Sequence, residues 1–384
     1  MMTPRRIFLA LVRALPLILL FSSGACSRVE APAPALPAAV GAGTAATVPA
    51  PTPSQKVRGM IDGHVASMLV SVAAKLRIAD HLREGPQSIA TLAAATRTHE
   101  DSLYRLLRAL TEIGVFSEEP AGTFRLNAAG EILRSDVPGS LRVAAEVAGE
   151  PWMRGAVGGL LYSIQTGGTS FDHIYGKGTF DYFSEPAHRE EAALFNSNQA
   201  AGTAVAAKAV ADAYDFSTTG SVVDVGGGLG ALLTAIMKKD AGPKGVLFDL
   251  PPVVTDAKSQ FDPTLAPRVE FVPGDFFKSI PGGHDIYLMK YILHDWNDKD
   301  SKAILATTRA AMNGRGKLLV VEVIVGPPNQ AGGKVGDVMM LARTGGRNRT
   351  EQEYRALLAS GGFDVTRVIR TKGDLSIIEA TPRP

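Results

Sequence analysis

The chain has 384 residues, 45% of them hydrophobic and 20% charged, which suits an ordinary globular protein of two domains with a sizeable core. Forty basic and 38 acidic residues leave a net charge of +2, so no global positive charge indicates nucleic-acid binding. A single cysteine excludes an internal disulfide and metal sites built from several cysteines, and we expect no metal site.

The first 26 residues have the proportions of an export signal. Arg5 and Arg6 precede an apolar stretch over 7–21, which is too short and too interrupted for a good transmembrane helix. The paired arginines resemble a twin-arginine signal. The stretch Ser-Gly-Ala-Cys resembles a lipoprotein cleavage box, with serine where leucine is usual, and it makes Cys26 a candidate lipid anchor. We therefore expect a protein of the cell envelope or periplasm.

The alternative is a cytoplasmic protein whose translation begins near Met60. Residues 27–55 separate the expected signal from the first periodic sequence. They are mostly alanine and proline, which cannot build a core, and we expect an extended linker.

Helical periodicity starts near Lys56, and residues 88–119 predict a helix, a turn and a second helix. The second helix begins near Glu100 or Asp101. Residues 114–127 predict a short hairpin with its turn at 120–122. One face of the second helix carries four leucines, Leu103, Leu106, Leu107 and Leu110.

Two helices followed by a hairpin are typical of a winged helix, a fold often used to read DNA. Residues 56–140 contain ten Lys or Arg and ten Asp or Glu, whereas a DNA reader should present a basic face. We therefore interpret residues 56–160 as a dimerisation domain and expect no nucleic-acid partner.

Beyond Phe216 the sequence alternates between strands and helices, which predicts an α/β domain with a doubly wound sheet. Residues 221–239 predict a strand, a glycine loop and a helix. Gly226, Gly228 and Gly230 let the backbone turn tightly and approach a ligand. The spacing also satisfies the dinucleotide fingerprint, so the loop alone is weak evidence.

The second strand of this domain ends in Asp249, a carboxylate that can accept hydrogen bonds from two ribose hydroxyls of either kind of nucleotide cofactor. A merely solvated aspartate at a strand end is the alternative. The third strand is expected to end in Gly274-Asp275-Phe276. A fourth is followed by a loop holding His294 and by a helix capped by Asn297 or Asp298.

A fifth strand carries Glu322 near its end. Ligand groups gather at the carboxyl ends of strands in doubly wound sheets. The side chains expected at this edge are those of Asp249, Asp275, His294 and Glu322, beside the glycine loop.

Several motifs, which follow one another in order over about 85% of the chain, are more specific evidence for a family than the glycine loop. They are VVDVGGGLGALL, DLPPVV, GDFF, LMKYILHDWND and GGRNRT, with looser matches at LYRLLRAL, FDYFSEP and LFNSN. From residue 56 onward the chain resembles the family of plant caffeic acid and bacterial hydroxyneurosporene O-methyltransferases. The resemblance implies a homodimer that uses S-adenosylmethionine, with a Rossmann-like class I methyltransferase domain over residues 161–384.

The resemblance also implies roles for individual residues. His294 would be the general base that removes a proton from a small, hydroxylated, aromatic acceptor, and Glu322 and Asn348 would flank it. The residues implied at the cofactor are Asp224, Gly226, Gly228, Asp249, Asp275, Phe276 and Lys290. Those implied at the acceptor are Asn196, Gln199, Asp295 and Met340.

Two residues depart from the family pattern. Asn348 stands where the family has a second acid, so the imidazolium form of His294 loses a stabilising charge. Gln199 stands where the family commonly has a methionine, which favours a more polar acceptor. Two alternatives therefore stay open. One is a family member with non-methyl chemistry, such as a hydroxylase, and the other is a winged-helix regulator with a degenerate methyltransferase domain.

Overall fold

The computed structural model describes residues 51–384, of which Pro53–Pro384 form one compact unit. The expected signal, the cleavage box at Cys26 and most of the linker lie outside the described residues. Helix α1 (Pro53–Lys75) begins inside the expected linker, because proline is well tolerated in the first turn of a helix. Within residues 51–384, no helix combines the length and apolar character needed to cross a membrane.

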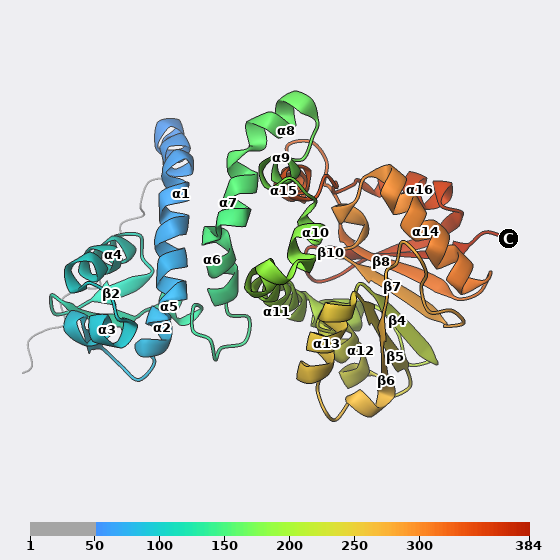
Figure 1. Cartoon of the computed structure of the whole chain (residues 1–384), viewed down its shortest axis with the longest axis horizontal. Coiled ribbons are helices and arrows are strands. Elements are labelled where there is room, and N and C mark those ends of the chain that lie inside the picture. Colours follow the sequence, from blue (N-terminus) through green and yellow to red (C-terminus); the bar gives the residue numbers. More distant parts are fainter. Residues whose placement is uncertain (1–50) are drawn as a thin grey trace, which may run out of the picture. The chain divides into compact units, whose positions relative to one another are not determined.

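The N-terminal helices enclose a small sheet with the strand order β1-β3-β2 (Figure 1). The expected hairpin and the apolar face of the second helix are confirmed. Leu103, Leu107 and Leu110 are buried, and Leu106 packs against them. The helix begins at Glu100 and is capped by His99. Strand β1 was not expected. The elements are α2 (Ile78–His81), β1 (Gln87–Ser88), α3 (Ile89–Thr96), α4 (Glu100–Glu112), β2 (Phe116–Glu118), β3 (Thr123–Leu126) and α5 (Ala128–Glu131).

A second group of helices connects this part of the chain to the large sheet. Trp152, Phe171 and Tyr182 form its aromatic core. The long helix α11 packs along α12 (Ala231–Lys239) and also contacts α6. No boundary near residue 160 divides the compact unit, so the boundary between the two expected domains stays a prediction. The elements are α6 (Arg142–Gly149), α7 (Pro151–Gly158), α8 (Leu160–Thr166), α9 (Ser170–Tyr175), α10 (Thr179–Ser184), η1 (Pro186–His188) and α11 (Arg189–Ala213).

The large sheet has seven strands in the order β6-β5-β4-β7-β8-β10-β9, and its first five strands are parallel. These five are the strands expected from the sequence, so the α/β fold class is confirmed. The antiparallel pair β9 and β10 adds an edge that was not anticipated. The strands are β4 (Ser221–Val225), β5 (Lys244–Asp249), β6 (Val269–Pro273), β7 (Ile286–Lys290), β8 (Lys317–Val323), β9 (Phe363–Arg370) and β10 (Leu375–Pro382).

The third of the parallel strands ends earlier than expected. Strand β6 stops at Pro273 instead of running to Phe276. The reason is local, because the Asp275 carboxylate accepts a hydrogen bond from the Phe277 backbone N–H at 2.9 Å and so starts a turn.

Helices cover both faces of the sheet, because neighbouring residues of each parallel strand point to opposite sides (Figure 1). Val222 packs on the side of α11, α12 and α13, whereas Val223 packs on the side of α14 and α16. Asn297 caps α14, as one of the two expected alternatives. The remaining elements are α12 (Ala231–Lys239), α13 (Pro251–Gln260), η2 (Ala266–Arg268), η3 (Leu293–Asp295), α14 (Asp298–Met312), α15 (Lys334–Arg343) and α16 (Glu351–Ser360).

Candidate active site

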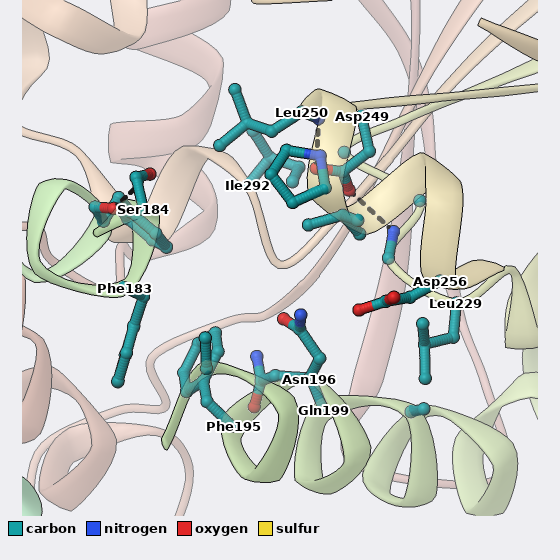
Figure 2. A pocket seen from close by; sticks show the side chains of 18 of the residues that line it. Phe183, Ser184, Phe195, Asn196, Gln199, Leu229, Asp249, Leu250, Asp256 and Ile292 are labelled. Atoms are coloured by element: carbon teal, nitrogen blue, oxygen red, sulfur yellow. Dashed lines mark hydrogen bonds between the residues drawn. The ribbon is translucent and has the colours of Figure 1, made fainter. Parts of the chain in front are cut away.

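A cavity of about 680 Å³ opens at the carboxyl ends of the parallel strands. In Figure 2, Phe195, Asn196 and Gln199 project from α11 on one side of it, and Asp249 and Ile292 lie on the other. Ten of the fourteen residues expected at the site line this cavity: Asn196, Gln199, Asp224, Gly226, Gly228, Asp249, Asp275, Phe276, Lys290 and Asp295.

The glycine loop after β4 has the backbone that its sequence predicts. Gly226, Gly228 and Gly230 all have positive φ, at 68°, 57° and 80°. A Cβ at Gly226 would lie 2.4 Å from Ile292 Cδ1, whereas a Cβ at Gly228 would meet nothing within 4 Å. The side of Gly228 that would carry a Cβ is therefore open. Any larger residue there would still be strained by its φ.

Asp249 holds the glycine loop in place. Its Oδ2 accepts a hydrogen bond from Gly228 N at 2.8 Å and its Oδ1 accepts one from Leu250 N at 2.7 Å (Figure 2). Burial raises the pKa of this carboxyl group, and the two backbone bonds oppose that rise. Each oxygen keeps a lone pair, so the same carboxylate can also accept ribose hydroxyls.

Asp224 and Lys290 place opposite charges deep in the cavity. Asp224 is 2% exposed, and its Oδ2 has no hydrogen-bond partner among the described residues. Burial raises its pKa to about 7, assisted by the nearby charge of Asp249. Lys290 Nζ donates to Thr203 Oγ1 at 2.5 Å and lies 4.0 Å from the centre of the Tyr291 ring. Burial lowers the pKa of Lys290 to about 8.

His294 lies in the short turn η3 between two carboxyl groups. Its Nδ1 is 3.2 Å from Glu322 Oε2, and its Nε2 is 3.6 Å from Asp295 Oδ1. Glu322 also accepts a hydrogen bond from the His294 backbone N–H at 3.3 Å. The Tyr291 ring stacks on the imidazole with ring centres 4.8 Å apart. Tyr291 has a φ of 57°, a conformation rare for a bulky residue and one often found at functional sites.

Burial controls the charges around this histidine. It lowers the pKa of His294 well below its usual range, and the cations Lys290 and Arg343 act in the same direction. Glu322 is fully buried, and this burial raises its pKa to about 8. Burial also raises the pKa of Asp295, to about 7. At neutral pH the imidazole is therefore unprotonated and free to accept a proton.

Four of the expected site residues lie behind the cavity wall instead of lining it: His294, Glu322, Met340 and Asn348. Asn348 Nδ2 donates to the Gly333 carbonyl at 2.8 Å, and its Oδ1 is buried without a hydrogen bond of good geometry. The Asn348 side chain is nevertheless close enough to raise the pKa of His294. Met340 is buried on α15.

Sequence reasoning missed Arg349, which holds the turn that contains His294. Arg349 is 1% exposed, and its guanidinium donates to the carbonyls of Leu293 at 2.8 Å and Trp296 at 3.0 Å. It also pairs with Asp298 at 2.7 Å. The signal was the second arginine of GGRNRT, which carried no assigned role. Within residues 51–384, no group of three His, Cys, Asp or Glu side chains could hold a metal ion.

The sequence of this chain matches those of known proteins. A model of the O-methyltransferase domain matches residues 159–364, and a model of the O-methyltransferase dimerisation domain matches residues 59–136. Phenazine O-methyltransferase of Lysobacter antibioticus is 40% identical over 325 residues, which cover 84% of this chain and 94% of that protein. The chain belongs to this O-methyltransferase family.

A solved O-methyltransferase from neocarzinostatin biosynthesis, in complex with S-adenosylmethionine and 2-hydroxy-5-methyl naphthoic acid, has a TM-score of 0.72 and 32% identity. The match covers 83% of this chain and 96% of that one. Aclacinomycin 10-hydroxylase of Streptomyces purpurascens is 33% identical over 330 residues, covering 83% of this chain and 87% of that protein. The fold is therefore shared with a relative named for a different reaction.

These findings confirm the family suspected from the motifs. The protein is an enzyme, an O-methyltransferase that uses S-adenosylmethionine. The cavity fits this cofactor in two independent ways. The unpartnered Asp224 oxygen is a suitable acceptor for an ammonium group, and the open side of Gly228 leaves room for a ligand beside Asp249.

Proposed function

We propose that this enzyme methylates a phenolic hydroxyl of a small aromatic acceptor, with His294 as the general base. The single observation that carries this proposal is the position of the His294 imidazole between Glu322 and Asp295, directly behind a cavity with aromatic walls. The aromatic side chains of that wall are Phe180, Phe183, Phe195, Phe276, Phe277, Tyr291 and Trp296. Relatives named for phenazine and naphthoate substrates support an aromatic acceptor.

The cofactor would be held at the strand ends and supplies an electrophilic methyl group on its sulfonium. Asp224 would accept the ammonium, and Asp249 the ribose hydroxyls. Asp275 and Phe276 would lie at the adenine, and Lys290 at the carboxylate end. Holding donor and acceptor in line removes most of the entropic part of the barrier.

The remaining task is to remove the acceptor proton. His294 Nε2 points toward Asp295, which lines the cavity, so this nitrogen is the one placed to receive the proton. Glu322 lies against the other ring nitrogen. Burial raises the pKa of this carboxyl group to about 8, and its ionised form would stabilise the imidazolium that forms. Arg349 fixes the turn through its two carbonyl contacts.

The opposite wall sets the polarity of the acceptor. Asn196 and Gln199 present amide groups to the cavity from α11 (Figure 2). A purely hydrocarbon acceptor would leave these amide groups without hydrogen-bond partners, and this would lower its affinity. We therefore propose an acceptor that carries oxygen or nitrogen atoms beyond its reacting hydroxyl.

The test is methyl transfer from S-adenosylmethionine to a panel of hydroxylated bicyclic and tricyclic aromatics, with wild type and His294→Ala. We expect turnover by wild type and a loss of about 10²-fold or more in the variant, with unchanged affinity for S-adenosylhomocysteine by calorimetry. Equal turnover by both proteins would exclude His294 as the base.

A second candidate, hydroxylation or another non-methyl reaction, is favoured by one observation. Asn348 supplies no negative charge beside His294, and the relative named as a hydroxylase shows that the fold accommodates such chemistry. Mass spectrometry of the product separates the two reactions, because methylation adds about 14 mass units per transfer and hydroxylation adds about 16.

We further propose that the enzyme is a homodimer through its N-terminal helices. Helix α1 exposes Val57, Met60, Ile61 and Val65, which are 50–68% accessible in the single chain. An exposed apolar row of this kind typically marks a protein interface. Light scattering should give twice the monomer mass, and Met60→Glu together with Ile61→Glu should shift it toward one.

The export signal stays a proposal that rests on the sequence alone. Adenosylmethionine is made in the cytoplasm, so an exported copy needs a cofactor bound before crossing, which a twin-arginine route permits for folded proteins. Fractionation of wild type, Arg5→Lys/Arg6→Lys and Cys26→Ala tests it. We expect envelope protein that becomes cytoplasmic in the double-lysine variant and loses membrane attachment in Cys26→Ala. Wild type found wholly in the cytosol would leave a cytoplasmic methyltransferase.

A further inference from the structure

Tyr291 has a backbone conformation that brings its ring onto the base. It follows directly after β7, and its φ of 57° lies in the left-handed region, which a bulky residue rarely adopts. Its backbone N–H donates to the Val321 carbonyl of β8 at 3.1 Å, so the turn is anchored to the sheet. The ring stacks on the His294 imidazole, with ring centres 4.8 Å apart and planes inclined by 14°. A strained residue held against the base points to a function for its side chain.

The Tyr291 ring also contacts the cationic side of the site. Lys290 Nζ lies over this ring, 4.0 Å from its centre, and donates a hydrogen bond to Thr203 Oγ1. The electron-rich face of an aromatic ring attracts cations, so the ring already holds one positive charge. Burial raises the pKa of the Tyr291 phenol to about 12. The ring therefore stays neutral while the groups around it change their charge.

Proton removal from the acceptor places a positive charge on His294, and its other neighbours stabilise that charge poorly at neutral pH. Asn348 offers only a neutral side chain, which raises the pKa of His294 less than a carboxylate would. Burial raises the pKa of Glu322 to about 8 and that of Asp295 to about 7, so both are largely protonated. The nearby cations oppose the new charge: Lys290, Arg343 and Arg349. The face of the Tyr291 ring remains available to stabilise it.

We propose that Tyr291 is a positioning residue for methyl transfer, whose ring fixes the plane of the His294 imidazole and stabilises its protonated form. The inference rests on the proposed methylation of a phenolic hydroxyl with His294 as the base. The cation–π attraction appears only when the stacked imidazole accepts the proton. It therefore stabilises the transition state more than the bound acceptor, and it raises kcat without changing KM.

This role has a signature in the acidity of the acceptor. A weakly acidic phenol must give its proton to His294 as the methyl group moves, so its rate depends on how well the imidazolium is stabilised. A phenol that is already ionised in solution needs no base, and its rate is independent of that stabilisation. A purely structural effect of Tyr291 on the shape of the cavity would change both rates alike.

The test measures methyl transfer at pH 7 to 1-naphthol and to 4-nitro-1-naphthol, whose hydroxyl is largely ionised at this pH. We expect Tyr291→Leu, which keeps the apolar bulk and removes the π face, to lower kcat for 1-naphthol by about 5- to 30-fold with little change in KM. The loss for the nitro compound should stay below about twofold. Tyr291→Phe should recover most of the loss. The matched control is Tyr162→Leu, which breaks a second tyrosine–histidine stack, on His173, outside the cavity lining, and it should match wild type.

A double-mutant cycle shows whether Tyr291 acts through the base. In the His294→Ala background, Tyr291→Leu should cause no further loss with 1-naphthol. The affinity for S-adenosylhomocysteine in calorimetry should be the same in wild type and Tyr291→Leu, because Thr203 still holds Lys290. A weaker affinity would assign Tyr291 to the cofactor and overturn the inference.

The remaining outcomes separate this inference from the proposed function. An equal loss with both naphthols in Tyr291→Leu, or the same loss in the presence and absence of His294, overturns the role of Tyr291 and leaves the proposed methylation intact. An unchanged rate in His294→Ala alone overturns the proposed base, and the role of Tyr291 falls with it.

Discussion

Replacing Glu322 with glutamine should stabilise the protein while slowing the reaction. Glu322 is fully buried, and burial raises its pKa from 4.5 to about 8. The unfolded chain therefore loses this proton near pH 4.5, whereas the folded protein keeps it until about pH 8. Between these values the folded state binds more protons than the unfolded state, so stability falls as pH rises, and the whole cost is present above pH 8.

The size of this cost follows from the two pKa values. At about 1.36 kcal/mol for each pH unit, the interval gives a ceiling of roughly 5 kcal/mol above pH 8, and almost nothing at pH 4. Glutamine has the same shape but no charge, so the variant should escape the loss. The gain must be smaller than the ceiling, because the glutamine amide still has to be accommodated beside His294.

The assay is thermal or denaturant unfolding of wild type and Glu322→Gln at pH 5 and pH 8.5. We expect the stability difference between the two proteins to grow in favour of glutamine by about 1 kcal/mol or more as pH rises. Glu351→Gln, at a partly exposed surface carboxylate, should show little change. Turnover of Glu322→Gln should fall relative to wild type above about pH 8, where wild type has an ionised carboxylate to stabilise the imidazolium. A difference that is independent of pH, or that grows in favour of wild type, would refute the electrostatic reasoning.

Three further substitutions test other parts of the site. Asp249→Ala removes a carboxylate that accepts two backbone hydrogen bonds and would accept the ribose hydroxyls. It should weaken S-adenosylhomocysteine binding by about 1.5–3 kcal/mol in calorimetry, and an unchanged affinity would show that Asp249 does not contact the ribose. Asn348→Glu should raise the pKa of His294 and speed methylation of weakly acidic phenols. A pH–rate profile identical to wild type would place Asn348 outside the chemistry. Arg349→Met removes the charged donor to the Leu293 and Trp296 carbonyls and leaves them longer hydrogen bonds, mainly from Ser301 Oγ. It should therefore cost about 1–3 kcal/mol of stability by denaturant titration, and a loss below roughly 0.5 kcal/mol would contradict a role for Arg349 in holding the turn.

The strand ends were predictable from sequence because their signals are local. A run of β-branched residues followed by glycines predicts both the strand β4 and the loop at Gly226, and the same logic places Asp249 and His294 at one edge. Strands β9 and β10 were not predicted, because no sequence motif marks them. They form through pairing of β10 with β9 and with β8. The role of Arg349 depends on which polar atoms lie near it, and a sequence does not contain that information.

Two glutamates in neighbouring strands show why burial alone does not mark a functional carboxyl group. Glu379 of β10 is only 4% exposed, and burial would raise its pKa, but hydrogen bonds from Arg367, Tyr214, Thr366 and Lys317 outweigh burial and lower it to about 2. Glu322 of β8 has no such set of donors, and its Oε2 has no hydrogen-bond partner in the described part of the chain. The fold thus satisfies one buried carboxyl group completely and leaves the other for the histidine. A carboxyl group left unsatisfied beside a base has something to gain when that base becomes charged, and this is what proton removal at His294 requires.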